Sequence, residues 1–299
     1  MFSAVHSMTE DAAREVIEKM RWPNGPVCPH CGATKIYTLK PKPTSTRPVR
    51  KGVYKCAKCR RQFTVTVKTV FEDSHIQLRV WLSAISLICC SKKGISALQL
   101  QRMLGISYRS AWFMAHRVRY AMSQPPLKEK LKGVVEVDET YFGAKRPMHR
   151  KMENKSAIFA LVQRGGTIRP IASKRIVGKD LHRAMREMID PSAHLMTDQH
   201  LMYRPIGKEF AKHDTIRHHL NEYVRGNVHT NTVEGFFGLL KRGVIGTYHS
   251  VGQKHLQRYA DEFAFRYNTR RETDLERAQM AIRATEGKRL MYKEPMKKK

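Results

Sequence analysis

Apolar residues recur at helical spacing through the first half of the chain. A stripe of this kind runs from Thr9 to Met20, and the acidic residues Glu10 and Asp11 at its start are typical of a first helical turn. The same spacing predicts three more helices, over 77–90, 96–104 and 107–122. A short helix, a turn with Gly105 and a longer basic helix favour a helix-turn-helix, although a plain helical connector with a basic solvated face fits the same pattern.

The pattern changes after a linker over 123–132. Apolar runs and alternation predict strands, and the expected strands lie at 134–138, 156–163, 167–177 and 194–197. A helix over 179–189 precedes the fourth strand, and helical stretches over 231–240 and 251–269 follow it. Three strands, a helix and a fourth strand predict an α/β domain.

These changes of pattern divide the chain into five segments. The protein is therefore expected to be a multidomain α/β protein. Its segments are an N-terminal helix (1–22), a small cysteine-containing module (23–67) with a flexible insert at 41–48, a helix-turn-helix-like region (68–124), the α/β domain (130–272) and a basic tail (273–299).

The charge balance indicates a polyanionic partner. The 299 residues include 56 Lys and Arg against 26 Asp and Glu, a formal net charge of +30. Such a surplus lies on the surface and favours contacts with phosphates, although ribosomal or membrane-surface proteins share this composition. The first residues lack the apolar core of a signal peptide, and the longest apolar run, 81–90, is too short to cross a bilayer. We expect a cytoplasmic, nucleoid-associated protein without a membrane partner.

Two CxxC pairs predict a structural zinc site. Each pair brings two thiolates onto one tight turn, and two such turns complete a tetrahedral Zn²⁺ shell. The ligands would be Cys28, Cys31, Cys56 and Cys59, with 24 residues between the pairs. A redox pair would need one CxxC in a βαβ setting, which the sequence here does not predict. Arg60 and Arg61, next to the second pair, are expected to face a nucleic-acid backbone.

Acidic residues end two of the predicted strands. Asp138 follows one apolar strand and Asp198 ends another, and neighbouring strands would bring both carboxylates together. A third carboxylate is expected from a helix across them, with Glu234 as the candidate. Lys241 lies seven residues further, two turns along the same face, where it could meet a phosphate. Three acidic groups around two Mg²⁺ or Mn²⁺ ions form an arrangement that activates a water or a 3′-hydroxyl.

Three other polar residues near these carboxylates are indicated less strongly as functional. Glu136 and Glu139 flank Asp138, and we expect both to point to the opposite face of the strand and not to bind metal. His229 could contact DNA or a scissile phosphate, and a structural role is at least as consistent with the sequence.

Long motifs in the chain resemble a known family. VEVDETYFG, the later TD and the block from HTNTVEGFFGLLKR to YNTR are similar to the DDE transposases of ISXO-type insertion sequences, and the cysteine module resembles their zinc ribbon. The resemblance extends from about residue 22 to 271. It implies an RNase H-like catalytic domain, with a mixed sheet flanked by helices, and a DDE triad at Asp138, Asp198 and Glu234.

The resemblance leaves the third ligand open. Transposases of this type also allow an Asn there, and Asn231 lies one turn before Glu234. We favour Glu234, because an anionic ligand suits Mg²⁺ and the spacing to Lys241 fits, with Asn231 beside the ligands.

The leading hypothesis is therefore a transposase. It would bind terminal inverted repeats, cleave double-stranded DNA at the element ends and join the 3′-hydroxyls to target DNA, acting as a dimer or larger oligomer. The DNA contacts expected outside the zinc module come from Arg109, Arg117, Lys241 and Arg242. A DNA-binding regulator without catalysis, and a nuclease of the same fold that does not join, are the alternatives.

Overall fold

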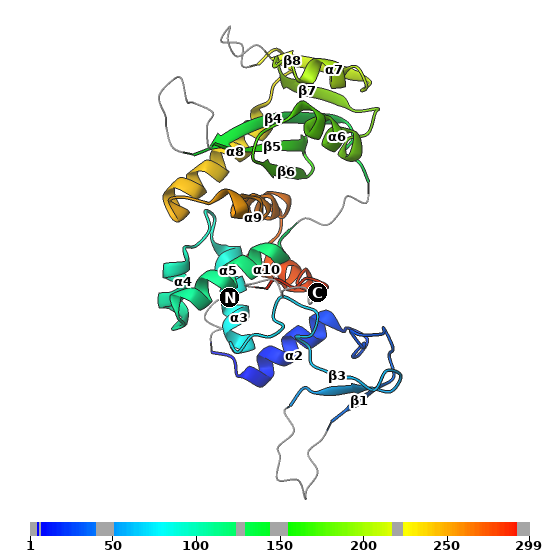
Figure 1. The fold of residues 1–299 in the computed structure, drawn as a ribbon, viewed down its shortest axis with the longest axis vertical. Coiled ribbons are helices and arrows are strands. Elements are labelled where there is room, and N and C mark those ends of the chain that lie inside the picture. Colours follow the sequence, from blue (N-terminus) through cyan, green and yellow to red (C-terminus); the bar gives the residue numbers. More distant parts are fainter. Residues whose placement is uncertain are drawn as a thin grey trace, which may run out of the picture. The chain divides into compact units, whose positions relative to one another are not determined.

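The computed structural model describes residues 5, 7–39, 51–123, 129–143, 155–216 and 224–291 (Figure 1). The chain forms two compact units, Met1–Met122 with Glu272–Lys299, and Ser123–Arg271. The predicted insert at 41–48, residues 124–128 of the linker and the end of the basic tail from 292 lie outside the described residues.

The first unit is mainly helical, and its helices are those that the sequence predicted. Thr9 and Ser96 accept hydrogen bonds from the first turns of their helices, and Gly105 turns the chain with a left-handed φ of 64°. The helices are α2 (Glu10–Arg21), α3 (Leu78–Cys90), α4 (Ala97–Leu104) and α5 (Tyr108–Ala121). Among the described residues, no helix combines the length and apolar character that crossing a bilayer requires.

Part of the segment expected as a basic tail is a further helix, α10 (Asp274–Arg283). Thr273 and Glu276 form a capping box at its start, a signal that is readable in the sequence. The buried face of α10 contacts α3 and α2, so this segment belongs to the first unit.

The cysteine module is a small antiparallel sheet in the order β1-β2-β3. Its strands are short: β1 (Ile36–Thr38), β2 (Tyr54–Cys56) and β3 (Gln62–Phe63). Trp22 lies against Tyr54 and Phe63, with ring centroids 5.6 and 5.9 Å away. Besides these rings, the buried apolar residues in the described part of the module are Cys28, Cys56 and Val65, which is a small core for a module that must fold.

The second unit contains a five-stranded mixed sheet in the order β6-β5-β4-β7-β8. β4, β5 and β6 pair antiparallel, whereas β4, β7 and β8 pair parallel. The strands are β4 (Val134–Phe142), β5 (Ser156–Gln163), β6 (Ile168–Ser173), β7 (His194–Asp198) and β8 (Lys212–Ile216). This mixed sheet confirms the predicted RNase H-like fold class. The sequence did not predict β8, whose residues KHDTI are mostly polar.

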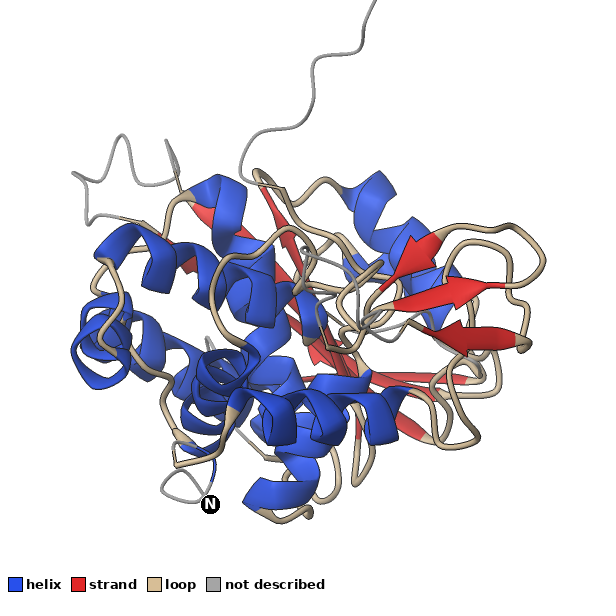
Figure 2. Ribbon diagram, turned by 90° about the horizontal axis from the view of Figure 1, so that it is seen from below, coloured by secondary structure: helices blue, strands red, loops and turns tan. Residues whose placement is uncertain are grey.

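Helices cover both faces of this sheet. Figure 2 colours the helices, strands and loops of the chain. Val135 and Val137 pack in the core beneath α6 (Gly178–Met188) and the short α7 (Tyr203–Gly207). Ile158 and Ala160 pack on the opposite face against α8 (Asn231–Gly243) and α9 (Leu256–Asn268). The two helices are joined by a π-helical turn, Val244–Tyr248, and a 3₁₀ turn, Gln253–His255.

Candidate active site

Asp138 and Asp198 lie on neighbouring parallel strands, β4 and β7. The strands pair in a register that sets Val134 opposite His194 and Glu136 opposite Met196. The same offset brings Asp138, in the middle of β4, level with Asp198 at the carboxyl end of β7. The prediction that these two strands are neighbours is therefore confirmed. The predicted strand end at Asp138 was wrong, because β4 continues to Phe142 through its pairing with β5.

Glu234 on α8 lies near enough to Asp138 to interact with it electrostatically. Burial raises the pKa of Asp138 to about 7, and the charges of Glu139, Asp198 and Glu234 add to the rise. Thr230 Oγ1 donates to Glu234 Oε1 at 2.7 Å, so this carboxylate is held by the residue that begins its helix. The structure thus brings the three proposed triad carboxylates to one region of the second unit.

The three carboxylates are suitable ligands for a cation, but their oxygens lie further apart than the ligands of a single ion do. Within the described ranges, only the four cysteines form a group whose ligand atoms all lie within 4.8 Å of one another. A pair of ions roughly 3.5–4 Å apart spreads its ligands further than one ion does. Because the raised pKa of Asp138 reflects unfavourable burial and like charges, a divalent cation would relieve that cost.

The two glutamates beside Asp138 differ from each other. Glu139 points to the opposite face as predicted, where Tyr203 Oη donates to its Oε2 at 2.5 Å and burial raises the pKa of Glu139 to about 7. For Glu136 the prediction was wrong. Side chains alternate with a period of two along a strand, so Glu136 lies on the face of Asp138.

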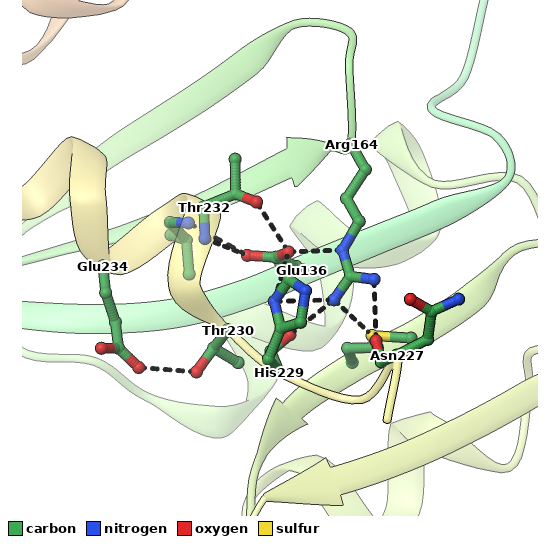
Figure 3. A network of polar contacts seen from close by, with 9 residues as sticks. Glu136, Arg164, Asn227, His229, Thr230, Thr232 and Glu234 are labelled. Atoms are coloured by element: carbon green, nitrogen blue, oxygen red, sulfur yellow. Dashed lines mark hydrogen bonds and ion pairs between the residues drawn. The ribbon is translucent and has the colours of Figure 1, made fainter. Parts of the chain in front are cut away.

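Glu136 is fully buried and lies at the centre of a polar network at the start of α8 (Figure 3). Its carboxylate accepts the backbone N–H groups of Thr232 at 2.8 Å and Val233 at 3.0 Å, and the Thr232 hydroxyl at 2.8 Å. Arg164 Nε donates to it at 2.6 Å. His229 Nδ1 lies 3.0 Å from Arg164 Nη2, which favours the structural role for this histidine. The sequence analysis did not identify Arg164. Counting the two-residue alternation along β4 would have placed Glu136 on the face of Asp138.

The four predicted zinc ligands converge in the first unit. Cys28 Sγ lies 3.6 Å from Cys59 Sγ, and Cys31 Sγ lies 3.6 Å from Cys56 Sγ. A tetrahedron of sulfurs around Zn²⁺ requires separations of roughly 3.8 Å. The backbone N–H of Cys59 donates to Cys56 Sγ at 3.5 Å and lowers the pKa of Cys56 to about 7, toward the thiolate that zinc binds. The cluster therefore fits a structural Zn²⁺.

Comparison with known families accounts for both parts of the chain. Residues 130–268 match the family model of the ISXO2-like transposase domain, and residues 8–62 match that of the transposase zinc-ribbon domain. The chain carries an ISXO2-like transposase domain behind a transposase zinc-ribbon domain. These two matches include the acidic cluster and all four cysteines, and they agree with the resemblance noted in the motifs.

Two individual proteins are also similar to this chain. A protein in transposable element ISH50 of Halobacterium salinarum is 27% identical over 278 residues, covering 87% of this chain and 91% of the relative. A chain from the intasome of simian T-cell lymphotropic virus, solved in complex with PP2A regulatory subunit B56 gamma, matches at 15% identity and a TM-score of 0.30. That match covers 61% of this chain and 64% of the viral one, and we draw no conclusion from it.

Most of the basic residues proposed to contact DNA are exposed. Arg60 and Arg61 follow the second cysteine pair, and Arg109 lies in the first turn of α5. Lys241 and Arg242 are exposed in the last turn of α8, on the helix that carries Glu234. Their side chains are accessible to a phosphate backbone, and their DNA contacts stay predictions.

Arg117 differs from these exposed residues, because the basic residues in the second half of α5 are buried. Arg117 is 6% exposed, and its guanidinium donates to three carbonyl oxygens, those of Val70, Glu72 and Leu290. Its neighbours on the helix, His116 and Arg119, are buried as well. This burial contradicts the predicted DNA contact of Arg117. The residue ties α5 to two other segments of the first unit.

Substitutions of Arg109 and Arg117 should therefore have different effects. Arg109→Ala is expected to weaken DNA binding and lower the slope of log affinity against log salt by about 1, with stability unchanged. Arg117→Met should lower the free energy of unfolding by about 2–4 kcal/mol, because it leaves buried carbonyls without donors. DNA titrations at several salt concentrations and denaturant unfolding measure both. A tenfold loss of DNA affinity in Arg117→Met at unchanged stability would restore the DNA role.

Proposed function

We propose that this protein is an insertion-sequence transposase that cleaves DNA at the element ends and joins the 3′-hydroxyls to target DNA. The observation that carries the proposal is the convergence of Asp138, Asp198 and Glu234 inside the ISXO2-like transposase domain. The two aspartates lie on paired strands, which hold them rigidly, and Glu234 comes from a helix packed on the same sheet face.

The three carboxylates would hold two Mg²⁺ or Mn²⁺ ions. When bound, such a pair activates a water or a 3′-hydroxyl and stabilises the leaving oxygen of an in-line displacement. Asn231, exposed one turn before Glu234, stands beside the ligands in this proposal, and Glu234 is the third ligand. Lys241, two turns further along α8, would neutralise a phosphate next to the site and hold the strand in place.

The first unit would recognise the terminal inverted repeats. Phosphate contacts from Arg60, Arg61 and Arg109 would position the duplex, and other exposed side chains of α5 would read bases. Since two element ends must be processed together, the active form on DNA is proposed to be a dimer or a larger oligomer.

A strand-transfer assay tests this function. Oligonucleotides would carry the inverted repeats found in the DNA that flanks the gene, with Mg²⁺ added. Asp138→Ala and Asp198→Ala should reduce joined product about a thousandfold or more, while their DNA affinity stays within twofold of wild type.

The products also separate the other two functions. Nicked DNA without a joined product would identify a nuclease. Binding that survives removal of Mg²⁺, with no nicking under any condition, would identify a regulator. Full strand transfer by Asp138→Ala would overturn the assignment of the site.

A further inference from the structure

Helix α8 does not use its own N-cap side chain to satisfy its first turn. The N-cap residue is Thr230, which makes no side-chain capping bond, and its hydroxyl instead donates to Glu234 Oε1 at 2.7 Å. The N–H groups of Thr232 and Val233, which an N-cap normally helps to satisfy, donate to Glu136 of β4. A carboxylate about a hundred residues earlier in the chain thus replaces the local cap and leaves Thr230 available to hold Glu234.

We propose that Glu136 is a positioning residue that sets Glu234 against Asp138; this inference rests on the proposed function. Glu136 and Asp138 are two residues apart on one face of β4. The strand that carries one proposed metal ligand therefore also anchors the helix that carries another. A negative charge at a helix N-terminus also interacts favourably with the helix dipole, which strengthens this anchor.

Arg164 completes the anchor. Its Nε donates to Glu136 at 2.6 Å, so the buried carboxylate has a counter-charge. Its two terminal nitrogens donate to the carbonyl oxygens of Asn227 at 2.8 Å and His229 at 2.9 Å. The segment leading into α8 is thereby tied to the same carboxylate as the first turn, and the entry point of the helix is held from both sides.

Glu136→Gln tests the positioning role. Gln keeps one acceptor oxygen but turns an N–H₂ group toward donors, so the pairing with Arg164 or with the helix N–H groups is lost. Small misplacement of a reacting group costs about 100-fold in rate. We expect kcat for strand transfer to fall about 10- to 100-fold. The KM for DNA should stay within twofold, since the exposed basic residues are unchanged.

The chain offers a matched control in Glu262. This glutamate is also fully buried in the second unit, where it pairs with Arg266 at 2.7 Å on α9 and accepts a hydrogen bond from Tyr248 Oη at 2.9 Å in the turn after α8. Glu262→Gln removes a charge of the same kind. It is expected to lower the melting temperature but to leave kcat unchanged at temperatures where the variant is folded.

Two measurements report on the anchor without strand transfer. Hydrogen exchange at the amides of Thr232 and Val233 should speed up at least about tenfold in Glu136→Gln and stay unchanged in Glu262→Gln. Mn²⁺ titration of the DNA-free protein should show weaker binding only in Glu136→Gln. If Glu136→Gln does not fold, Thr232→Val decides the matter, because it removes only the hydroxyl that donates to Glu136 and should give a smaller loss of kcat, about threefold.

The outcomes separate the two proposals. Suppose that Glu136→Gln has the kcat, Mn²⁺ affinity and amide exchange of wild type, and that Asp138→Ala is inactive. That result would overturn the positioning role and leave the proposed function in place. The same result in Thr232→Val, where that variant is the one that folds, would also overturn it. Strand transfer by Asp138→Ala would instead overturn the proposed function.

Discussion

Asp138→Asn is expected to make the second unit more stable at pH 8 in the absence of Mg²⁺, while it abolishes strand transfer. Burial raises the pKa of Asp138 from 3.8 to about 7. At pH 8 the folded protein therefore carries a charge that it holds less favourably than the unfolded chain does. Removing that charge should raise the free energy of unfolding by about 2–4 kcal/mol.

The stability difference between wild type and Asp138→Asn should grow with pH. Between pH 3.8 and about 7 the folded state binds more protons at Asp138 than the unfolded state does, so this group lowers stability as pH rises. Wild type and Asp138→Asn should therefore be close in stability near pH 4 and differ fully above pH 7.

Denaturant unfolding at pH 5 and pH 8, with zinc retained, measures the difference. Addition of Mg²⁺ should stabilise wild type at pH 8 and should have a much smaller effect on Asp138→Asn. A variant that is less stable than wild type at pH 8 without Mg²⁺ would show that Asp138 has a favourable partner in the metal-free protein, and would contradict the prediction.

Loss of zinc should unfold the cysteine module and leave the second unit folded. The strands of the module are only two or three residues long, and its core is a packed set of three aromatic rings with few other buried apolar residues in the described part. Structural Zn²⁺ contributes about 10–16 kcal/mol in zinc-finger peptides, which is more than such a core can replace. Cys56→Ser should therefore lose bound zinc and the hydrogen-exchange protection of residues 27–39 and 51–65, and bind DNA more weakly.

Cys90→Ser is the matched control, because Cys90 is an exposed cysteine outside the cluster. It should keep one zinc per chain, full protection and wild-type DNA affinity. Peptides from the second unit should keep their protection in both variants. Retention of zinc and protection by Cys56→Ser would show that the other three cysteines and a different ligand suffice.

Features that depend on neighbouring residues could be predicted from the sequence. Helical spacing and capping residues predicted α2, α3, α4 and α5 closely, because these signals act within a few residues. The cysteine pairs predicted the metal cluster, since two tight turns can present four thiolates in only a few ways. The apolar strand pattern indicated Asp138 and Asp198 as well, although Asp138 lies in the middle of β4 and only Asp198 ends its strand.

Features whose partners lie far away in the chain could be seen only in the folded protein. The polar strand β8 has little apolar pattern of its own and is held by its pairing with β7. The basic pattern of α5 predicted a DNA contact for Arg117, but its guanidinium donates to the carbonyl oxygen of Leu290. Glu136 accepts a hydrogen bond from the first turn of α8, about a hundred residues later in the chain. Burial and hydrogen bonding between distant segments depend on how the segments pack, and no local pattern of residues records that packing.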